Sequence, residues 1–206
     1  MTASIIVLAS GRGTNLQALI DACSSGALPA RIVAVYSHTP TALALERARR
    51  HGIPATFVAP PAKNAPREAR DAWDTALADR IAAAEPDVIV FAGWMRIVGE
   101  RFIERFPDPR HPGRARILNL HPASPGELPG HDAIVRAFEQ AEQGTRTETG
   151  VMVHVVAPEV DAGPVIAHER VAIPAGIGFE GFEAAMHEVE HRLIVRAVAA
   201  FLRGEA

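Results

Sequence analysis

The chain has 206 residues, of which 48% are hydrophobic and 22% are charged, and its formal net charge is −3 at pH 7. These values are typical of a folded globular protein, and they argue against disorder and against a strongly positive surface for nucleic acid. The single cysteine, Cys23, excludes an intrachain disulfide and a cysteine-based metal cluster. No apolar run approaches the roughly 18 residues of a membrane span. We expect a soluble, cytoplasmic protein with no nucleic-acid or membrane partner.

The amino-terminal part alternates between apolar runs and helical patterns. Residues 4–9 (SIIVLA) predict a buried strand, and after a glycine turn apolar residues recur at helical spacing over 14–26. A second strand is predicted over 31–36, a helix over 41–52 and a short strand over 55–58. Because the first apolar run lacks a preceding basic segment, we expect a strand there rather than a signal peptide.

The alternation then continues through a longer unit. Residues 67–84 predict a helix that ends before Pro86, and residues 86–93 (PDVIVFAG) predict a strand buried on both faces. Regular alternation of strands and helices predicts an α/β fold with a doubly wound, mostly parallel, Rossmann-like sheet.

After residue 117 the pattern is less regular. We predict a strand over 117–121, a helix over about 132–143, two extended segments within 149–173 joined by the loop PEVDAGP, and an amphipathic helix over 179–203. No repeat or linker divides the sequence. We therefore expect a single domain over 1–206.

The segment SGRGTNL, residues 10–16, lies between the first strand and the first helix. Glycines permit a tight turn, and the free N–H groups of the first helical turn attract an anion. Thr14 and Asn15 add side-chain donors. No Walker lysine follows, and Leu16 replaces the third glycine of the dinucleotide fingerprint. A phosphate monoester is favoured over a dinucleotide, with a plain capped turn as the structural alternative.

Two polar side chains end the strand over 117–121. Asn119 and His121 are two residues apart, so they point the same way, while Leu118 and Leu120 face the opposite side. Ligands of open α/β sheets bind where the carboxyl ends of the strands meet. The loops SGRGTN, GWMRIV and NLHPASPG are therefore expected to converge on one site.

Asp161, in the loop PEVDAGP, is the third candidate. A carboxylate beside an imidazole raises the pKa of the imidazole and fixes its tautomer. A set of Asn119, His121 and Asp161 without a serine or cysteine nucleophile fits direct acyl transfer between two bound substrates, with Asn and His stabilising the oxyanion. A polar strand end and a surface turn remain the structural alternatives.

Four segments together resemble the phosphoribosylglycinamide formyltransferase family: SGRGTNLQAL, PDVIVFAGWMRIV, ILNLHPA and EVDAGPVI. They occur in the family's order over nearly the whole chain. The resemblance implies a formyltransferase-type Rossmann-like fold and a step of de novo purine biosynthesis, in which 10-formyltetrahydrofolate donates its formyl group to the amine of 5-phosphoribosylglycinamide. It implies small-molecule substrates and no metal, and it leaves a homodimer open.

The resemblance also implies roles for individual residues. Asn119, His121 and Asp161 match the catalytic set, with Asp161 raising the pKa of the histidine. The substrate sites are implied to consist of Gly13, Thr14, Asn15 and Glu190 for the ribonucleotide, with His187 as a second candidate, and of Arg70, Met95, Arg96, Ile97, Val98 and Asn119 for the folate. We accordingly expect a phosphate-binding half over 1–115 and a catalytic half over 116–206.

The chain also departs from the family pattern. The family commonly has H-P-S-L-L-P after the catalytic histidine, whereas this chain has HPASPGELPG. His131 directly follows Gly130, one position earlier than the histidine of the commoner form, and we assign it no role. Residues 108–116 (DPRHPGRAR) predict a longer, solvated surface loop.

Several alternatives remain. Methionyl-tRNA formyltransferase adds a carboxyl-terminal RNA-binding domain, formyltetrahydrofolate hydrolase adds an amino-terminal regulatory domain, and a sugar-nucleotide formyltransferase is expected to lack this phosphate turn. A Rossmann dehydrogenase would carry an acidic residue at the end of the second strand. The chain has VYSHTP there.

Overall fold

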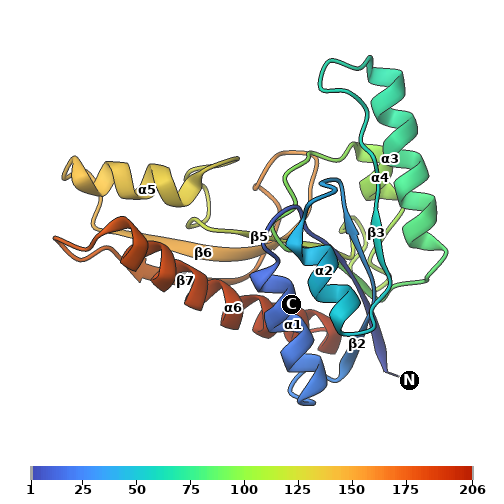
Figure 1. Ribbon diagram of the computed structural model, residues 1–206, viewed down its shortest axis with the longest axis horizontal. Helices are drawn as coiled ribbons and strands as arrows, with labels where there is room; N and C mark the ends of the chain where they lie inside the picture. Colours follow the sequence, from blue (N-terminus) through green and yellow to red (C-terminus); the bar gives the residue numbers. More distant parts are fainter. Residues whose placement is uncertain (1, 206) are drawn as a thin grey trace.

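The computed structural model describes residues 2–205, which contain one seven-stranded sheet in the order β3-β2-β1-β4-β5-β6-β7 (Figure 1). The elements are, in chain order, β1 (Ala3–Leu8), α1 (Thr14–Ser24), β2 (Ala30–Ser37), α2 (Leu43–Arg50), β3 (Ala55–Phe57), α3 (Arg67–Ala82), β4 (Val88–Phe91), α4 (Glu100–Glu104), β5 (Ile117–His121), α5 (Ala133–Glu142), β6 (Glu148–Val155), β7 (Val165–Ala172) and α6 (Phe179–Arg203).

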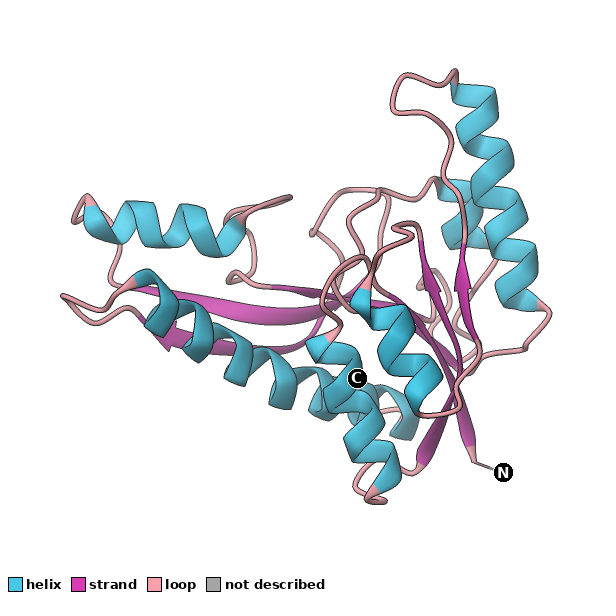
Figure 2. Ribbon diagram, viewed as in Figure 1, coloured by secondary structure: helices cyan, strands magenta, loops and turns pink. Residues whose placement is uncertain are grey.

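The sheet is parallel from β3 to β5, and the last two strands are antiparallel to their neighbours. The chain first extends the sheet from β1 through β2 to β3, then returns to the other side of β1 with β4 and β5. Helices lie on both sides of the sheet (Figure 2). The predicted α/β class with a doubly wound, mostly parallel sheet is confirmed.

Most predicted elements are present with small differences in their ends, and the helix predicted over 179–203 has those bounds. Helix α4, only five residues long, was not predicted from the sequence. Such a helix is too short to show a 3.6-residue period. Its first turn is positioned by a long-range contact instead, because the Gly99 N–H donates to Asp74 Oδ2 at 2.7 Å.

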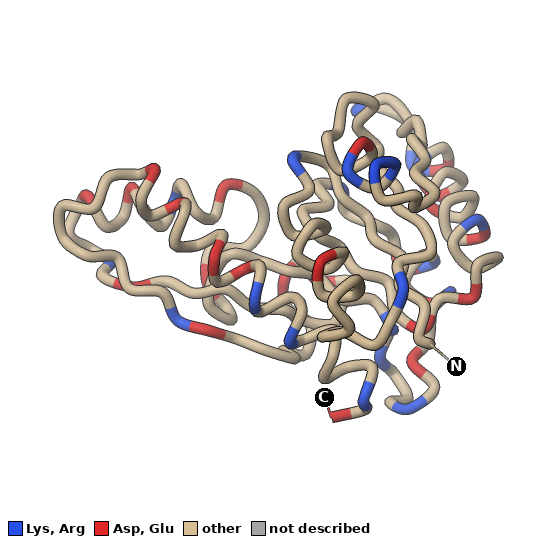
Figure 3. Tube along the Cα trace, turned by 60° about the horizontal axis from the view of Figure 1, so that its bottom comes forward, with Lys and Arg blue, Asp and Glu red and all other residues tan. Residues whose placement is uncertain are grey.

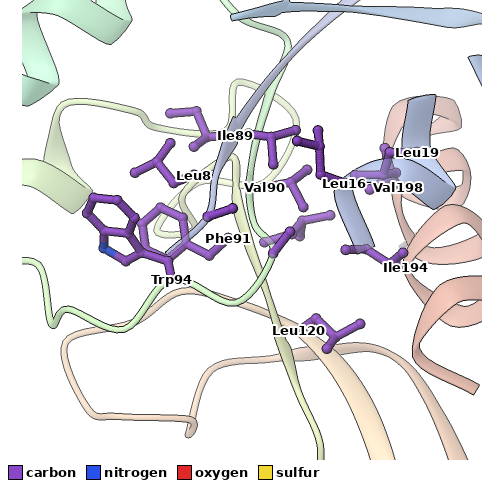
Figure 4. Close-up of a cluster of buried hydrophobic side chains, with 14 of the residues drawn as sticks. Leu8, Leu16, Leu19, Ile89, Val90, Phe91, Trp94, Leu120, Ile194 and Val198 are labelled. Atoms are coloured by element: carbon purple, nitrogen blue, oxygen red, sulfur yellow. The ribbon is translucent and has the colours of Figure 1, made fainter. Parts of the chain in front are cut away.

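The core joins the sheet to the first and last long helices. Leu16 and Leu19 of α1 lie beside Ile194 and Val198 of α6 (Figure 4), and all four side chains are fully buried. Burial of each such side chain contributes about 1.5–3 kcal/mol. This packing holds α6 against α1 and so brings the middle of α6 close to the glycine turn.

The loop over 108–116 is not merely solvated, so that prediction is wrong. Asp108 is buried and contacts the His111 Nδ1 at 2.9 Å and the Arg110 Nε at 3.2 Å. The Arg110 guanidinium donates to the Phe201 carbonyl at 2.5 Å and lies 4.6 Å from the centre of the Phe201 ring. The loop therefore caps the negative end of α6 with a cation.

The sheet continues across residue 115, because β4 pairs with β5. The functional halves over 1–115 and 116–206 remain a prediction. Positive and negative side chains are intermixed along the chain (Figure 3). Within residues 2–205, no helix has the length and apolar character needed to cross a membrane.

Candidate active site

The loops that follow β1, β4 and β5 meet at the carboxyl edge of the sheet. The Ser10 N–H donates to the Gly93 carbonyl at 2.9 Å, and the Met95 N–H donates to Ser10 Oγ at 3.0 Å. Phe91, the last residue of β4, is paired with Asn119 of β5. The strand order reverses between β1 and β4, because β2 and β3 lie on one side of β1 and β4 and β5 on the other. Doubly wound sheets bind their ligands at the carboxyl edge beside such a reversal.

The glycine turn requires glycine at one position in particular. Gly13 has a φ of +72°, and a Cβ there would lie 2.7 Å from the Ala44 Cα. Both the left-handed backbone and the close approach of α2 exclude a larger residue. Gly13 is the N-cap of α1, and no side chain caps that helix. The first-turn N–H groups of α1 are therefore suited to an anionic ligand.

A hydrogen-bonded chain connects this turn to α6. Asn15 Nδ2 donates to Glu190 Oε2 at 3.0 Å, although the two residues are 175 positions apart. The same oxygen is 3.0 Å from His187 Nδ1, and His187 Nε2 is 2.9 Å from Arg12 Nη2. The structure thus brings the predicted Asn15, Glu190 and His187 together. It adds Arg12, which was not predicted as a site residue. Its position between two glycines of the turn is the feature of the sequence that could have identified it.

Asn119, His121 and Asp161 also come together. Asn119 Nδ2 donates to Asp161 Oδ1 at 3.1 Å, and His121 Nδ1 lies 3.4 Å from Asp161 Oδ2. The Gly130 N–H donates to Asp161 Oδ2 at 2.8 Å. Asp161 has a φ of +54°, an uncommon conformation for a residue other than glycine that costs of order 1–3 kcal/mol. The carboxylate is therefore held by three contacts, two from β5 and one from the loop over 122–130.

Burial dominates the charge state of His121, whose side chain is only 5% exposed. Burial lowers the pKa of His121 below its ordinary value, and the nearby Asp161 carboxylate and Leu128 carbonyl offset this lowering only in part. The predicted effect of Asp161, which is to raise the pKa of this histidine, is therefore present. The carboxylate acts in the expected direction, but desolvation of the imidazolium is the larger effect.

Asp161 itself is ionised near neutral pH. Burial raises its pKa, but contacts from His154, the Gly130 N–H and His121 outweigh burial and leave the pKa of Asp161 below its ordinary value. His121 Nε2 lies 3.0 Å from the Leu128 carbonyl oxygen. Each ring nitrogen of His121 thus faces an oxygen acceptor, an environment that would satisfy an imidazolium in full.

His154 is a site residue that was not predicted from the sequence. It is 2% exposed and lies opposite Asn119 in the β5–β6 ladder, with Nε2 3.0 Å from Asn119 Nδ2 and 3.4 Å from Asp161 Oδ1. The pairing of β6 with β7 shifts register between Val153 and His154. Such irregularities often re-aim a side chain beside an active site. A histidine inside the apolar run VMVHVV is the feature of the sequence that could have identified this residue.

The predicted folate residues lie on two segments. In the loop after β4, Met95 and Ile97 are 56% and 74% exposed, whereas the Val98 side chain is buried. Arg96 is partly buried in the same loop, and Arg70 is exposed in the first turns of α3. Two large apolar side chains in solvent are consistent with a surface that a ligand covers.

Helix α3 fixes the position of that loop. The rings of Trp73 and Trp94 are stacked at 6.3 Å between centroids, and the Arg96 guanidinium lies 5.0 Å from the centre of the Trp73 ring. Asp74 holds the end of the loop through the Gly99 N–H. Burial raises the pKa of Asp74 above its ordinary value. Trp73 and Asp74 were not predicted as site residues, because their role depends on contacts between α3 and the loop.

In the part of the chain that the structure describes, no three His, Cys, Asp or Glu side chains are grouped to share a metal ion. The absence of a metal from the reaction remains a prediction.

Comparison with known proteins identifies the family. A family model described as formyl transferase matches residues 3–198. The chain is 40% identical over 203 residues to a phosphoribosylglycinamide formyltransferase of Schizosaccharomyces pombe, covering 96% of both chains, and 35% identical over 202 residues to that of Escherichia coli, covering 98% of this chain and 88% of the other. The crystal structure of glycinamide ribonucleotide transformylase 1 from Symbiobacterium toebii is similar with a TM-score of 0.84 and 35% identity, over 98% of this chain and 89% of that chain. This chain belongs to the formyl transferase family.

Proposed function

We propose that this chain transfers the formyl group of 10-formyltetrahydrofolate to the amine of 5-phosphoribosylglycinamide, a step of de novo purine biosynthesis. The observation that supports the proposal is the mutual contact of Asn119, His121 and Asp161 at the end of β5. This is the same edge of the sheet at which the glycine turn contacts the loop with Met95 and Ile97. Such a site has one wall suited to an anion, the glycine turn, a second wall with exposed apolar side chains, the loop after β4, and acid–base groups on the neighbouring strand.

The reaction exchanges one carbon–nitrogen bond for another. The free amine of the ribonucleotide attacks the formyl carbon, and the bond between that carbon and the folate nitrogen then breaks. The amine loses one proton and the folate nitrogen gains one, so no net proton is consumed. A desolvated crevice favours the uncharged amine, which is the attacking form.

His121 is suited to carry that proton. Its lowered pKa favours the neutral imidazole, which can accept a proton as the amine attacks and give it to the folate nitrogen as the carbon–nitrogen bond breaks. The ionised Asp161 then stabilises the imidazolium, which in turn stabilises the oxyanion on the formyl oxygen. Because this charge pair forms only as the tetrahedral intermediate forms, the stabilisation is specific to the transition state.

Asn119 and the loop over 122–130 must both adjust for this step. The two amide hydrogens of Asn119 are engaged by His154 and Asp161, so a bond to the oxyanion replaces one of these contacts. The Leu128 carbonyl faces His121 Nε2 and also accepts a bond from Arg136 Nη2 at 2.8 Å. Contact between a substrate oxygen and Nε2 therefore requires Leu128 to move.

The remaining assignments follow from the two walls. Gly13, Thr14 and Asn15 would bind the phosphate, and Glu190 would accept bonds from ribose hydroxyls. The folate would contact Asn119, Arg70 of α3, and the loop after β4 through Met95, Arg96, Ile97 and Val98. In this proposal 10-formyltetrahydrofolate is the only co-substrate. The protein acts in the cytoplasm, and its oligomeric state, monomer or homodimer, is left open.

The test is a steady-state assay of formyl transfer with the wild type, His121→Ala and Asp161→Asn, and with His51→Ala as a matched control. His51 is an exposed histidine at the end of α2. We expect kcat to fall by roughly 10²–10⁴-fold in the two site variants and to be unchanged in the control. Retention of wild-type kcat in both site variants would refute the proposed mechanism.

A further inference from the structure

The contact between Arg12 and His187 has a chemical consequence that depends on protons. A guanidinium only donates hydrogen bonds, so the Arg12 Nη2 contact at 2.9 Å requires His187 Nε2 to accept. His187 Nδ1 then carries the ring's one hydrogen and donates it to Glu190 Oε2 at 3.0 Å. While this contact is formed, His187 is therefore a neutral imidazole with Nε2 unprotonated.

A phosphate changes which form of His187 fits. The oxygens of a phosphate dianion only accept hydrogen bonds, so neutral His187 presents a lone pair to them and binds poorly. Once His187 is protonated, Nε2 and the Arg12 guanidinium both donate, and they can no longer contact each other favourably. An anion placed between them satisfies both donors. Without an anion, the two side chains are therefore hydrogen-bonded to each other. With an anion bound, both are positively charged and both donate to it.

The surroundings of His187 support a charged form. On α6, Glu190 contacts Nδ1, Glu183 lies 3.9 Å from Nε2, and the ring of His191 is stacked at 6.3 Å between centroids. From the glycine turn, Arg12 is the opposing cation. The hydrogen bond to Glu190 is the largest influence, and it raises the pKa of His187 above its ordinary value despite burial and Arg12.

A second observation also points to a ligand at this turn. Asn15 is 8% exposed, and its Oδ1 atom is buried without a hydrogen-bond partner in the described structure. A buried acceptor of this kind costs about 1–3 kcal/mol unless a donor reaches it. A phosphate ester that carries a hydroxyl or an amine would provide such a donor.

We propose that Arg12 and His187 form a phosphate clamp in which His187 takes up one proton when the anion binds. The inference rests on the proposed function, which places a phosphate ester at the glycine turn. It adds Arg12 to that site, gives His187 a specific role there, and makes binding of the ester dependent on pH. Affinity for the phosphate decreases as pH rises above the pKa of free His187, because the proton must then be taken from a more alkaline solution.

Calorimetry with ribose 5-phosphate tests the clamp without formyl transfer. Binding is measured at pH 7.5 in two phosphate-free buffers that differ in ionisation enthalpy, and the difference in heat counts the protons taken up. The phosphate is a dianion at this pH, because its second pKa is about 6. Ribose, which lacks the phosphate, is the ligand control.

The variants are Arg12→Gln and His187→Gln, with Arg203→Gln as the control for loss of one positive charge. Arg203 ends α6, about 24 Å along the helix from His187. We expect net proton uptake by the wild type and the control, and none by His187→Gln. We expect Arg12→Gln to bind ribose 5-phosphate at least about 10-fold more weakly. Absence of proton uptake by the wild type, or unchanged affinity in Arg12→Gln, would overturn the clamp.

Failure of the clamp and failure of the proposed function give different results. If ribose 5-phosphate binds with proton uptake but no formyl group is transferred to the ribonucleotide, the clamp stands and the proposed function is wrong. If transfer occurs and Arg12→Gln leaves the KM for the ribonucleotide unchanged, the function stands and the clamp is wrong.

Discussion

The two sides of the candidate site are built from different kinds of structure. The ribonucleotide side consists of residues 10–15 with His187 and Glu190, and its unusual backbone geometry falls on Gly13. The catalytic side consists of Asn119, His121, His154 and Asp161 with the loop over 122–130. Within residues 2–205, four residues other than glycine have a positive φ, and three of them, Leu128, Asp132 and Asp161, belong to or adjoin the catalytic side.

The difference shows what determines the backbone conformation of each side. A glycine turn followed by a helix is specified locally, because glycine adopts a left-handed backbone at little cost. Leu128 and Asp161 adopt that backbone with the support of tertiary contacts: the Arg136 side chain donates to the Leu128 carbonyl, and the Gly130 N–H donates to the Asp161 carboxylate. We therefore expect the catalytic side to be sensitive to loss of single contacts, and the ribonucleotide side to depend on one glycine.

The largest expected effect is on the catalytic side. Asp161→Asn replaces an ionised carboxylate that contacts His121, Asn119 and the Gly130 N–H. We expect kcat to fall by roughly 10²–10⁴-fold, because the amide does not stabilise an imidazolium. Asp21→Asn, at an exposed position of α1, is the control. A decrease below about 10-fold would remove Asp161 from the mechanism.

On the ribonucleotide side, we expect the addition of a single methyl group at Gly13 to reduce both stability and binding. Gly13→Ala combines a left-handed backbone with a contact of 2.7 Å to the Ala44 Cα. We expect a loss of unfolding free energy greater than the roughly 1–2 kcal/mol of the backbone cost alone, together with a raised KM for the ribonucleotide. Gly26→Ala is the matched control, since Gly26 has a φ of +79° but a Cβ there would meet nothing within 4 Å. Equal thermal denaturation curves for the two variants would contradict this account.

A smaller effect is expected on the folate wall. Trp73→Leu removes the stacking with Trp94 and the contact with the Arg96 guanidinium. The stacking contributes about 0.5–1.5 kcal/mol and the contact with the guanidinium about 0.5–1 kcal/mol, so we expect the KM for the folate to rise about 5-fold to 70-fold with the KM for the ribonucleotide unchanged. An equal rise in both KM values would show that Trp73 supports the whole site rather than its folate side.

The smallest expected change is in the titration of His121. Because burial lowers its pKa, the ring should take up a proton at a pH below the ordinary value of 6.5, and activity that needs the neutral ring should fall only below that pH. NMR of histidines labelled at the ring carbon measures the midpoint directly. Asp161→Asn removes a contact that raises the pKa, so the midpoint should move further down. A midpoint above 6.5 in the wild type would contradict the neutral form of His121.

Local patterns were sufficient to predict the frame of the site. The apolar run before the glycine turn predicted β1, and the stripe over 179–203 predicted α6, because both signals lie within a few residues. The alternation of side chains on a strand was enough to place Asn119 and His121 together. What remained unpredicted depends on distant segments. Arg12 and His187 are 175 positions apart, and the pKa of His121 follows from burial that no local pattern reveals.

The loop over 108–116 illustrates the same limit. Its prolines, glycine and charges suggested a solvated loop, yet Asp108 is buried and Arg110 contacts the end of α6. The composition was interpreted correctly as non-helical, but the partner of the loop lies far along the chain, as the separation of 91 positions between Arg110 and Phe201 shows.

The most direct test of the central claim follows the formyl group itself. The purified protein is mixed in a single turnover with 10-formyltetrahydrofolate that carries an isotopic label in the formyl group, with and without 5-phosphoribosylglycinamide, and the labelled products are separated. The account predicts that the label is recovered on the amine of the ribonucleotide and that the donor persists when the ribonucleotide is omitted. Recovery of the label as formate at the same rate with or without the ribonucleotide would contradict it, and would make the protein a hydrolase.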